Sequence, residues 1–338
     1  MQAGELVTSI QTFPGVSSLC AFGCDSGTIS VFDSETNDYI FQSNFDKFFS
    51  NEKSNNRILS IDIPDETSLY AIDNHNLARF DVRVEQTKPI YQITYEYEIF
   101  DISCSSSSIF AVASRYNSGI ITYDNRNLQR KINENQLNSI PPSALSFFDN
   151  NTLLVGYEDS SIGIWNILSE EYKFFEIPLF LHHRKLSPLS ILKTLSHQGN
   201  DNYFQYLKDH EKETNENVGF VVGYQSGFSI YNYDGHINTS KLIYGESGEH
   251  RSFGQRGKFG KSVLAPCLGD NYIITIVDDS TLLPVLLTDD SSLYKSKDLH
   301  GSLLTSIAAN KLFITAIEDD EEGYITVLLP ESFTDLEI

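Results

Sequence analysis

Two segments of the sequence end in the same order of residues: an aromatic residue, an aspartate, a variable residue and an arginine. They are Phe80-Asp81-Val82-Arg83 and Tyr123-Asp124-Asn125-Arg126. An arginine carries a planar fork of N–H donors that matches a carboxylate, and an aspartate two residues earlier lies on the same face of a strand. Asp81, Arg83, Asp124 and Arg126 are therefore candidate residues for binding a protein partner. The alternative, which the sequence alone favours, is that each aspartate and arginine stabilise their own turn.

A second candidate site is a basic loop at residues 250–261, HRSFGQRGKFGK, which contains no carboxylate. Its cationic residues are Arg251, Arg256, Lys258 and Lys261. With the two phenylalanines between them, they could bind a phosphate, an acidic peptide or RNA. The favoured alternative is a glycine-rich loop whose charges pair with the protein's own acidic surface. A nucleotide-binding phosphate loop is not predicted, because Gln255 stands where that motif has its first glycine.

The histidines and cysteines form no recognisable site. Four histidines, His182, His183, His197 and His210, match no zinc-binding spacing and are expected to be exposed loop residues. Cys20 and Cys24 fall in a predicted strand and its turn, where both thiols are expected to pack against apolar neighbours.

Acidic runs at 278–279, 289–290 and 319–322 could suggest calcium binding or general acid-base catalysis. They lack the alternating oxygen ligands of a calcium loop, so we interpret them as solvated hairpin turns. The sequence therefore predicts no metal, no cofactor and no catalytic residues.

The chain has 338 residues, with 46 acidic and 24 basic side chains and a net charge of -22. Its 40% hydrophobic and 12% aromatic content argues against a mainly disordered chain. Such a charge repels nucleic acid and anionic membranes and favours a protein partner, although it also fits simple solubility. No apolar run is long enough to span a membrane, and the N-terminus lacks a signal-peptide pattern. With four scattered cysteines, these features predict an intracellular protein of the nucleus or cytoplasm.

The elements that must position the candidate residues are repeated hairpins. The clearest covers Leu153 to Ile167, where an apolar strand is followed by an acidic turn and an alternating strand. Runs that alternate with period two and are rich in Val, Ile, Phe and Tyr indicate strands, and the Gly, Asn, Asp and Ser residues between them indicate turns. Seven such hairpins begin at Cys20, Leu69, Phe110, Leu153, Phe220, Tyr272 and Leu312.

Further strand-like segments accompany the hairpins. First strands are predicted at 6–15, 57–66, 98–107, 141–150 and 303–311, and fourth strands at 38–45 and 89–94. Most hairpins begin about 40 to 50 residues apart, close to the period of a four-stranded propeller blade. The sequence therefore predicts one all-β domain over residues 1–338, a seven-bladed propeller with four antiparallel strands per blade. A surface insertion is expected near 195–218, and 332–338 is a candidate outer strand of the last blade.

The hairpin endings resemble the WD-repeat β-propeller family, in which an aromatic residue and an aspartate end a strand. The matching pairs are Phe32-Asp33, Phe80-Asp81, Tyr123-Asp124, Trp165-Asn166 and Tyr231-Asn232. The chain departs from the family pattern in having one tryptophan and no clear Gly-His pair before most blades. This resemblance implies a scaffold for protein–protein interaction rather than an enzyme.

The consecutive Asp-x-Arg endings add a second resemblance, to substrate receptors of cullin-RING ubiquitin ligases, which dock on a triple-propeller adaptor through a tandem WD-x-R box. Phe80 and Tyr123 stand where that family prefers tryptophan. The resemblance implies that the adaptor subunit is a partner within a larger complex. The alternative is an acidic chaperone or assembly factor that binds a basic client, such as a histone or a ribosomal protein. A hydrolase, from another functional class, would need histidines and carboxylates that converge on the central channel.

Overall fold

The computed structural model describes the N-terminal half of the chain in most detail. Backbone and most side chains are described for residues 5–16, 18–49, 57–84, 88–105, 109–114, 119–126, 140–147, 150–159 and 161–174. Elsewhere, the structure describes the backbone of the strands named below and the side chains of residues 324–326 and 328. Within the described residues, no helix is long and apolar enough to cross a membrane.

The described strands form seven antiparallel sheets, and each sheet is built from strands that follow one another in the chain. The first sheet contains β1 (Val7–Thr12), β2 (Leu19–Cys24), β3 (Thr28–Asp33) and β4 (Asp38–Asn44), which is followed by a short 3-10 helix, η1 (Phe45–Lys47). The second contains β5 (Ser60–Asp62), β6 (Ser68–Ile72), β7 (Asn76–Asp81) and β8 (Tyr91–Thr94). The third contains β9 (Ile99–Cys104), β10 (Ile109–Ser114), β11 (Ile120–Asp124) and β12 (Asn127–Asn135). The fourth contains β13 (Pro142–Phe147), β14 (Thr152–Tyr157), β15 (Ile162–Asn166) and β16 (Tyr172–Phe175).

Three further sheets complete the described strands. The fifth contains β17 (Ser190–Ile191), β18 (Val218–Tyr224), β19 (Gly227–Tyr233) and β20 (Ser240–Leu242). The sixth contains β21 (Ser262–Leu264), β22 (Tyr272–Ile276), β23 (Thr281–Leu286) and β24 (Lys297–Asp298). The seventh has three described strands, β25 (Leu303–Ala309), β26 (Phe313–Asp319) and β27 (Glu322–Leu328).

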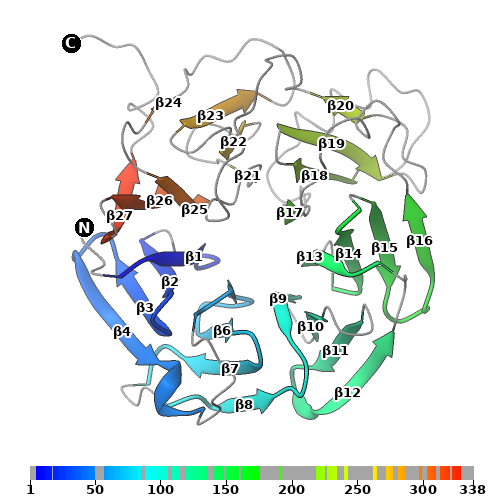
Figure 1. The fold of residues 1–338 in the computed structure, drawn as a ribbon, viewed down its shortest axis with the longest axis horizontal. Coiled ribbons are helices and arrows are strands. Elements are labelled where there is room, and N and C mark those ends of the chain that lie inside the picture. The colour runs from blue at the N-terminus through cyan, green and yellow to red at the C-terminus, as the bar shows by residue number, and fades with distance from the viewer. Residues whose placement is uncertain are drawn as a thin grey trace.

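The sheets are arranged around a central axis as the blades of a β-propeller (Figure 1). The strand order places the first strand of each blade innermost and the fourth outermost. The seven sheets fit the predicted seven blades, and the all-β, antiparallel architecture is confirmed. That residues 1–338 form a single domain stays a prediction, and the expected insertion near 195–218 and the candidate strand at 332–338 lie outside the described residues.

The first and last blades are neighbours in the ring. Strand β1 contacts β25, β26 and β27, and Ile325 of β27 packs with Val7, Ile10 and Phe22 of the first blade. Strand β1 and strands β25 to β27 belong to different sheets. Among the described strands, the first and last blades therefore meet through side-chain packing, and neither contributes a strand to the other's sheet.

The core lies between neighbouring blades, because each blade buries both of its faces. Every residue of β6 and of β10 is buried, whereas β4 and β8 on the outer edge retain exposed residues. This explains why the second strands read as continuous apolar runs and the fourth strands alternate. One cluster joins the first two blades, with the rings of Phe41 and Phe80 5.6 Å apart.

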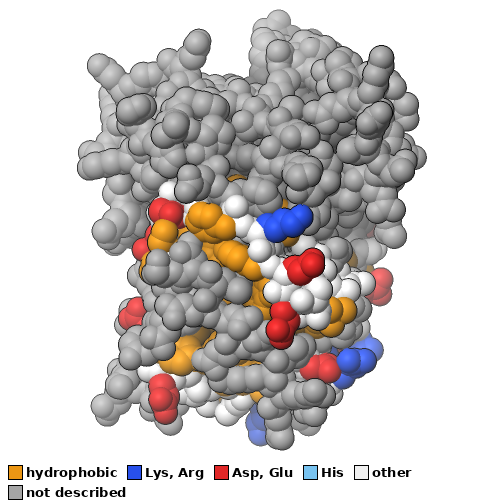
Figure 2. Space-filling view, turned by 90° about the vertical axis from the view of Figure 1, so that its right-hand side faces the viewer, with side chains coloured by type: hydrophobic (Ala, Val, Ile, Leu, Met, Phe, Trp, Pro, Cys, Tyr) orange, Lys and Arg blue, Asp and Glu red, His pale blue; other side chains and the backbone are white. Residues whose placement is uncertain are grey.

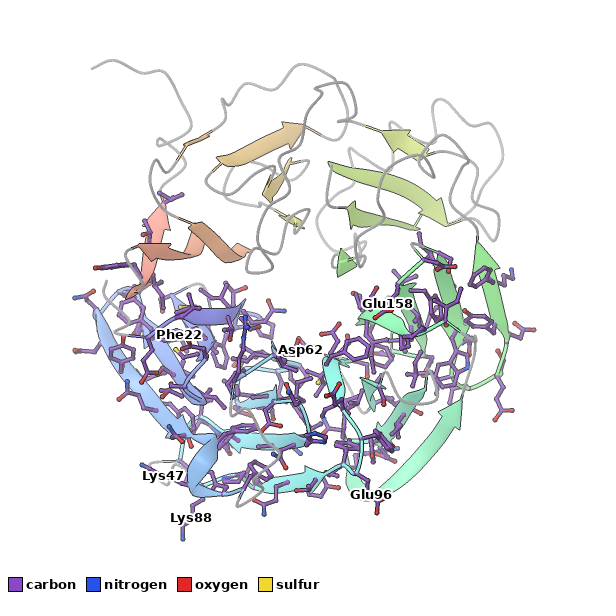
Figure 3. All side chains as sticks on the ribbon, viewed as in Figure 1. Phe22, Lys47, Asp62, Lys88, Glu96 and Glu158 are labelled. Atoms are coloured by element: carbon purple, nitrogen blue, oxygen red, sulfur yellow. The ribbon has the colours of Figure 1, made fainter. Side chains whose placement is uncertain are left out.

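The innermost strands are also linked by hydrogen bonds from side chains to the backbone of the next blade. The hydroxyl of Ser9 accepts from the N–H of Ile61 at 3.2 Å. The carboxylate of Asp62, on the inner side of the ring in Figure 3, accepts from the N–H of Cys104 at 2.6 Å. These bonds satisfy polar groups where blades converge and fix the register of each blade against its neighbour.

Candidate protein-binding rim

Four consecutive blades have the same turn after their third strand, which we call the corner turn. In each, a side-chain Oδ1 accepts a hydrogen bond of 2.9 to 3.1 Å from the backbone N–H two residues later. The accepting residues are Asp33, Asp81, Asp124 and Asn166, and the donors are Glu35, Arg83, Arg126 and Leu168. Asp and Asn favour such turns because their short polar side chains reach their own backbone. This bond accounts for the Asp or Asn that ends each third strand.

The corner turns lie on one face of the ring. In an antiparallel sheet of four strands, the first and third links leave from the same end. The backbone confirms this pairing, since Val82 donates to Thr67 at 2.9 Å and Ile167 donates to Asn151 at 2.8 Å. In the second and fourth blades, the corner turn therefore packs against the first link of its own blade. We call the corner turns of the first four blades together the rim.

Arg83 and Arg126 each fold back onto the aspartate of their own corner turn. Arg83 donates from Nε and Nη2 to the two carboxylate oxygens of Asp81 at 3.0 and 2.7 Å. Arg126 makes the same pair of bonds to Asp124, both at 3.1 Å. The arginine side chains are 67% and 77% exposed, whereas those of the aspartates are 17% and 18% exposed. What faces solvent is therefore the guanidinium of each pair.

The ion pair between Asp81 and Arg83 shifts the pKa of both of its partners. Hydrogen bonds from the Arg83 guanidinium lower the pKa of Asp81 below its usual value, and the same bonds raise the pKa of Arg83. The bonds to Asp124 likewise raise the pKa of Arg126. Both aspartates and arginines thus stabilise their own turns, as the alternative interpretation of the sequence requires. Partner binding by these residues stays a prediction.

The exposed apolar residues of the rim are not among the residues predicted from the sequence. Leu168 occupies the position in the fourth blade that Arg83 and Arg126 occupy in the second and third. Val84 and Ile90 lie in the link that carries Arg83, and Figure 3 places Lys88 of this link at the outer edge of the ring. An alignment of the four endings FDSE, FDVR, YDNR and WNIL would have revealed Leu168, because its last column reads Glu, Arg, Arg, Leu.

The basic loop lies outside the described residues, so Arg251, Arg256, Lys258 and Lys261 stay a predicted anion- or peptide-binding site. The four clustered histidines also lie outside them, as do residues 278–279 and 289–290. Of the acidic run at 319–322, the structure describes the two end residues, and Asp319 of β26 pairs with Glu322 of β27 as a hairpin requires.

Cys20 and Cys24 pack as predicted. Both are buried in the cluster that joins the first and last blades. Burial, reinforced by the charge of Asp33, raises the pKa of the Cys20 thiol to about 12. Burial also raises the pKa of Cys24 and of Cys104. These thiols stay protonated at neutral pH, which suits packing and not nucleophilic chemistry.

The described part of the chain contains no group of three metal-binding side chains. The carboxylates on the inner strands are engaged in structural bonds instead. Asp101 accepts from the hydroxyl of Ser60 at 2.8 Å and from the N–H of Leu145 at 2.7 Å, so it joins three blades.

Comparisons with known proteins agree with this architecture. No protein-family model matches the chain, and no curated protein matches it in sequence. Among solved structures, the β-propeller domain of Cps50 (Swd1) from Myceliophteria thermophila is similar, with a TM-score of 0.67 and 12% identity over 96% of this chain and 96% of that chain. At this identity, the likeness is one of fold. The chain thus has a β-propeller fold, as its sequence repeats, its sheets and its similarity to a solved propeller structure all indicate.

Proposed function

We propose that this protein is a non-enzymatic scaffold that binds a protein partner through its rim. The observation that carries the proposal is the equivalent placement of Arg83 and Arg126 on consecutive blades, each held by its own aspartate and each largely exposed. Propellers serve many functions, so the argument rests on these residues and not on the fold.

The ion pairs prepare the arginines for binding. Two of the five N–H donors of each guanidinium bind the aspartate of the same turn, and the others are available to a partner. A flexible arginine loses side-chain entropy on binding, whereas one already held in place loses less. Because the corner turns are equivalent, a partner must present two acceptors with a matching separation. The pair therefore favours specificity of docking more than affinity.

The resemblance to substrate receptors of cullin-RING ubiquitin ligases suggests which partner this is. In that role, the rim would hold the adaptor subunit, and another face of the propeller would select the substrate. Support comes from the tandem Asp-x-Arg endings. The chain departs from the family pattern in having Phe80 and Tyr123 where tryptophan is usual. Such a receptor would be one subunit of a larger complex in the nucleus or cytoplasm.

The net charge of -22 favours a second candidate, an acidic chaperone or assembly factor for a basic client protein. A client held by the overall charge would lose affinity steeply as salt rises, because exposed charges are screened. Binding anchored at the rim would depend mainly on the two arginines.

Direct binding of the purified triple-propeller adaptor tests the first candidate. We expect wild-type protein to bind, and the double variant Arg83→Ala/Arg126→Ala to bind at least about tenfold more weakly. The control is Lys47→Ala/Lys173→Ala, which removes the same charge from exposed sites away from the corner turns. Equal binding by all three proteins, or a loss shared by the control, would contradict the role of the rim. Steep salt dependence with a basic client and no adaptor binding would favour the second candidate.

A further inference from the structure

Several large hydrophobic side chains reach the surface in links that follow the third strands, as the rim arginines do. Those described as exposed are Tyr39, Ile40, Val84, Ile90, Leu168 and Phe174. Three of the six lie in links between third and fourth strands. Val84 and Ile90 share the link that carries Arg83, and Leu168 lies in the corner turn of the fourth blade. Two of the others, Tyr39 and Ile40, belong to the outer strand β4.

Hydrogen bonds within the corner turn of the fourth blade fix the backbone at Leu168, whose side chain is exposed to solvent. The side chain of Asn166 accepts from the N–H groups of Leu168 and Ser169 at 3.1 and 3.0 Å, which fixes the backbone. The preceding Ile167 is buried, whereas Leu168 is 69% exposed. In the second blade, Val82 is buried at the position of Ile167, and Val84, one residue beyond Arg83, is 45% exposed. In both blades, a buried apolar residue follows the Asp or Asn of the corner turn, and an exposed apolar residue follows within two positions.

The charge and polarity of the outward-facing residue change from one corner turn of the rim to the next. The equivalent position is Glu35 in the first blade, arginine in the second and third, and leucine in the fourth. Hydrophobic side chains also reach the surface among charged ones on the flank of the ring that carries β16 (Figure 2). Along the rim, apolar residues therefore lie on both sides of the two arginines. In the first blade the equivalent residue is Glu35, whose negative charge would repel an acidic partner.

We infer that a docking surface runs over the corner turns of the second, third and fourth blades, with Val84 and Ile90 at one end and Leu168 at the other. It fits a folded protein that presents carboxylates opposite Arg83 and Arg126 and apolar side chains on both sides of them. This inference rests on the proposed function and extends it by defining the length of the surface and the chemistry of its partner. Arginine is enriched among the interface residues that contribute most to binding, and the contacts around such residues exclude water from them.

An anionic membrane has a related chemistry, since exposed leucine and arginine could enter a lipid headgroup layer. The net charge of -22 opposes that arrangement, because the protein as a whole is repelled from an anionic surface. A protein with a local acidic patch can meet the two guanidiniums without approaching the rest of the acidic surface. The charge balance therefore favours a protein as the occupant.

Site-specific photo-cross-linking in the full-length protein, in its native cell, tests the inference. The cross-linking amino acid replaces Leu168, Val84 or, as a matched control, Ile40, which is 48% exposed on β4. We expect one protein, identified by mass spectrometry, to be linked from both 168 and 84 and not from 40. The link should disappear when Arg83→Ala/Arg126→Ala is added, and Leu168→Ser should reduce its yield at position 84 about fivefold or more.

Several results would overturn the inference, and they differ from failure of the proposed function. Cross-linking at 168 no stronger than at 40, or a product at 168 that persists without the two arginines, would remove the fourth blade from the surface. If the protein sediments with phosphatidylserine vesicles and Leu168→Ser abolishes this, the surface binds a membrane and not a protein partner. If Arg83→Ala/Arg126→Ala loses a partner but no protein is cross-linked from position 168, the proposed function stands and only the extension of the surface to the fourth blade is contradicted. If the arginine variant keeps every partner, the proposed function itself fails.

Discussion

The buried hydroxyl of Tyr70 donates a hydrogen bond to the side-chain oxygen of Asn125, the middle residue of the corner turn that carries Arg126. Tyr70 belongs to the second blade and Asn125 to the third, so this bond joins the two blades that carry the rim arginines. The guanidinium of Arg79 lies over the Tyr70 ring at 5.6 Å and donates to Ser68 at 3.0 Å. A buried tyrosine of the second blade, which carries Arg83, is therefore tied directly to the corner turn that carries Arg126.

Tyr70→Phe should lower the free energy of unfolding by about 1 kcal/mol, the usual contribution of one hydrogen bond between partly buried groups. The chain has one tryptophan, and Trp165 is fully buried, so its fluorescence during urea unfolding measures the change. Tyr39→Phe is the control, because Tyr39 is exposed and its hydroxyl has no partner among the described residues. Equal loss of stability in both variants would contradict a specific role for the bond to Asn125.

Asp101→Ala should be more costly, because this carboxylate accepts bonds from the second and the fourth blade. Loss of two bonds to a charged acceptor, one of them from the backbone N–H of Leu145, should lower stability by about 3 kcal/mol. Removal of the exposed carboxylate of Asp38 on β4 should change it by less than about 0.5 kcal/mol. A small effect of Asp101→Ala in the same urea titration would show that these two bonds contribute little to the packing of the blades.

Gly23→Ala tests the packing between the first two blades. A Cβ atom at Gly23 would lie 2.7 Å from the Cβ of Ile58, which is fully buried. We expect a loss of about 1–3 kcal/mol from overpacking. Ile58→Ala alone should cost about 2–5 kcal/mol because it leaves a cavity. The double variant should cost clearly less than the two single changes together, since each relieves the other, and strict additivity would show that the two sites do not touch.

The buried thiols give a prediction for alkaline pH. Burial raises the pKa of Cys20 from its ordinary value of 9.0 to about 12, so the protonated thiol is favoured in the folded state. This contribution to stability is complete below pH 9 and is lost as the pH rises from 9 towards 12, because only the unfolded chain then ionises. Unfolding free energies measured across this range should fall less in Cys20→Ala than in wild type.

The same burial should protect the thiols from alkylation. At pH 8 in native protein, iodoacetamide should label the peptides that contain the buried Cys20 and Cys24 far more slowly than in urea. Peptide mass mapping reads each site separately. Rapid labelling of Cys20 in the folded protein would contradict the packing between the first and last blades.

Much of the fold follows from local patterns that the sequence displays directly. The alternating runs and their turns predict the hairpin of β14 and β15 to within a residue or two, because strand period and turn chemistry are local. The candidate pairs Asp81-Arg83 and Asp124-Arg126 could be found for the same reason, since both partners lie in one turn.

Contacts between blades could not be predicted in this way. Nothing near Tyr70 in the sequence points to Asn125, because the two meet only when the second and third blades pack together. Leu168 was missed because its importance lies in the equivalence of four turns, and a single exposed leucine has no distinctive pattern. The orientation of each guanidinium towards its own aspartate also needed the folded turn, because the sequence allowed both this pairing and one with a partner.

Affinity purification from the native cell tests the central claim most directly. Wild-type protein, Arg83→Ala/Arg126→Ala and the control Lys47→Ala/Lys173→Ala are compared by quantitative mass spectrometry, with urea unfolding to show that all three are equally stable. The account predicts that at least one abundant co-purifying protein is lost only from the variant without the rim arginines. An unchanged set of co-purifying proteins in that variant would contradict the claim that the rim binds a protein partner.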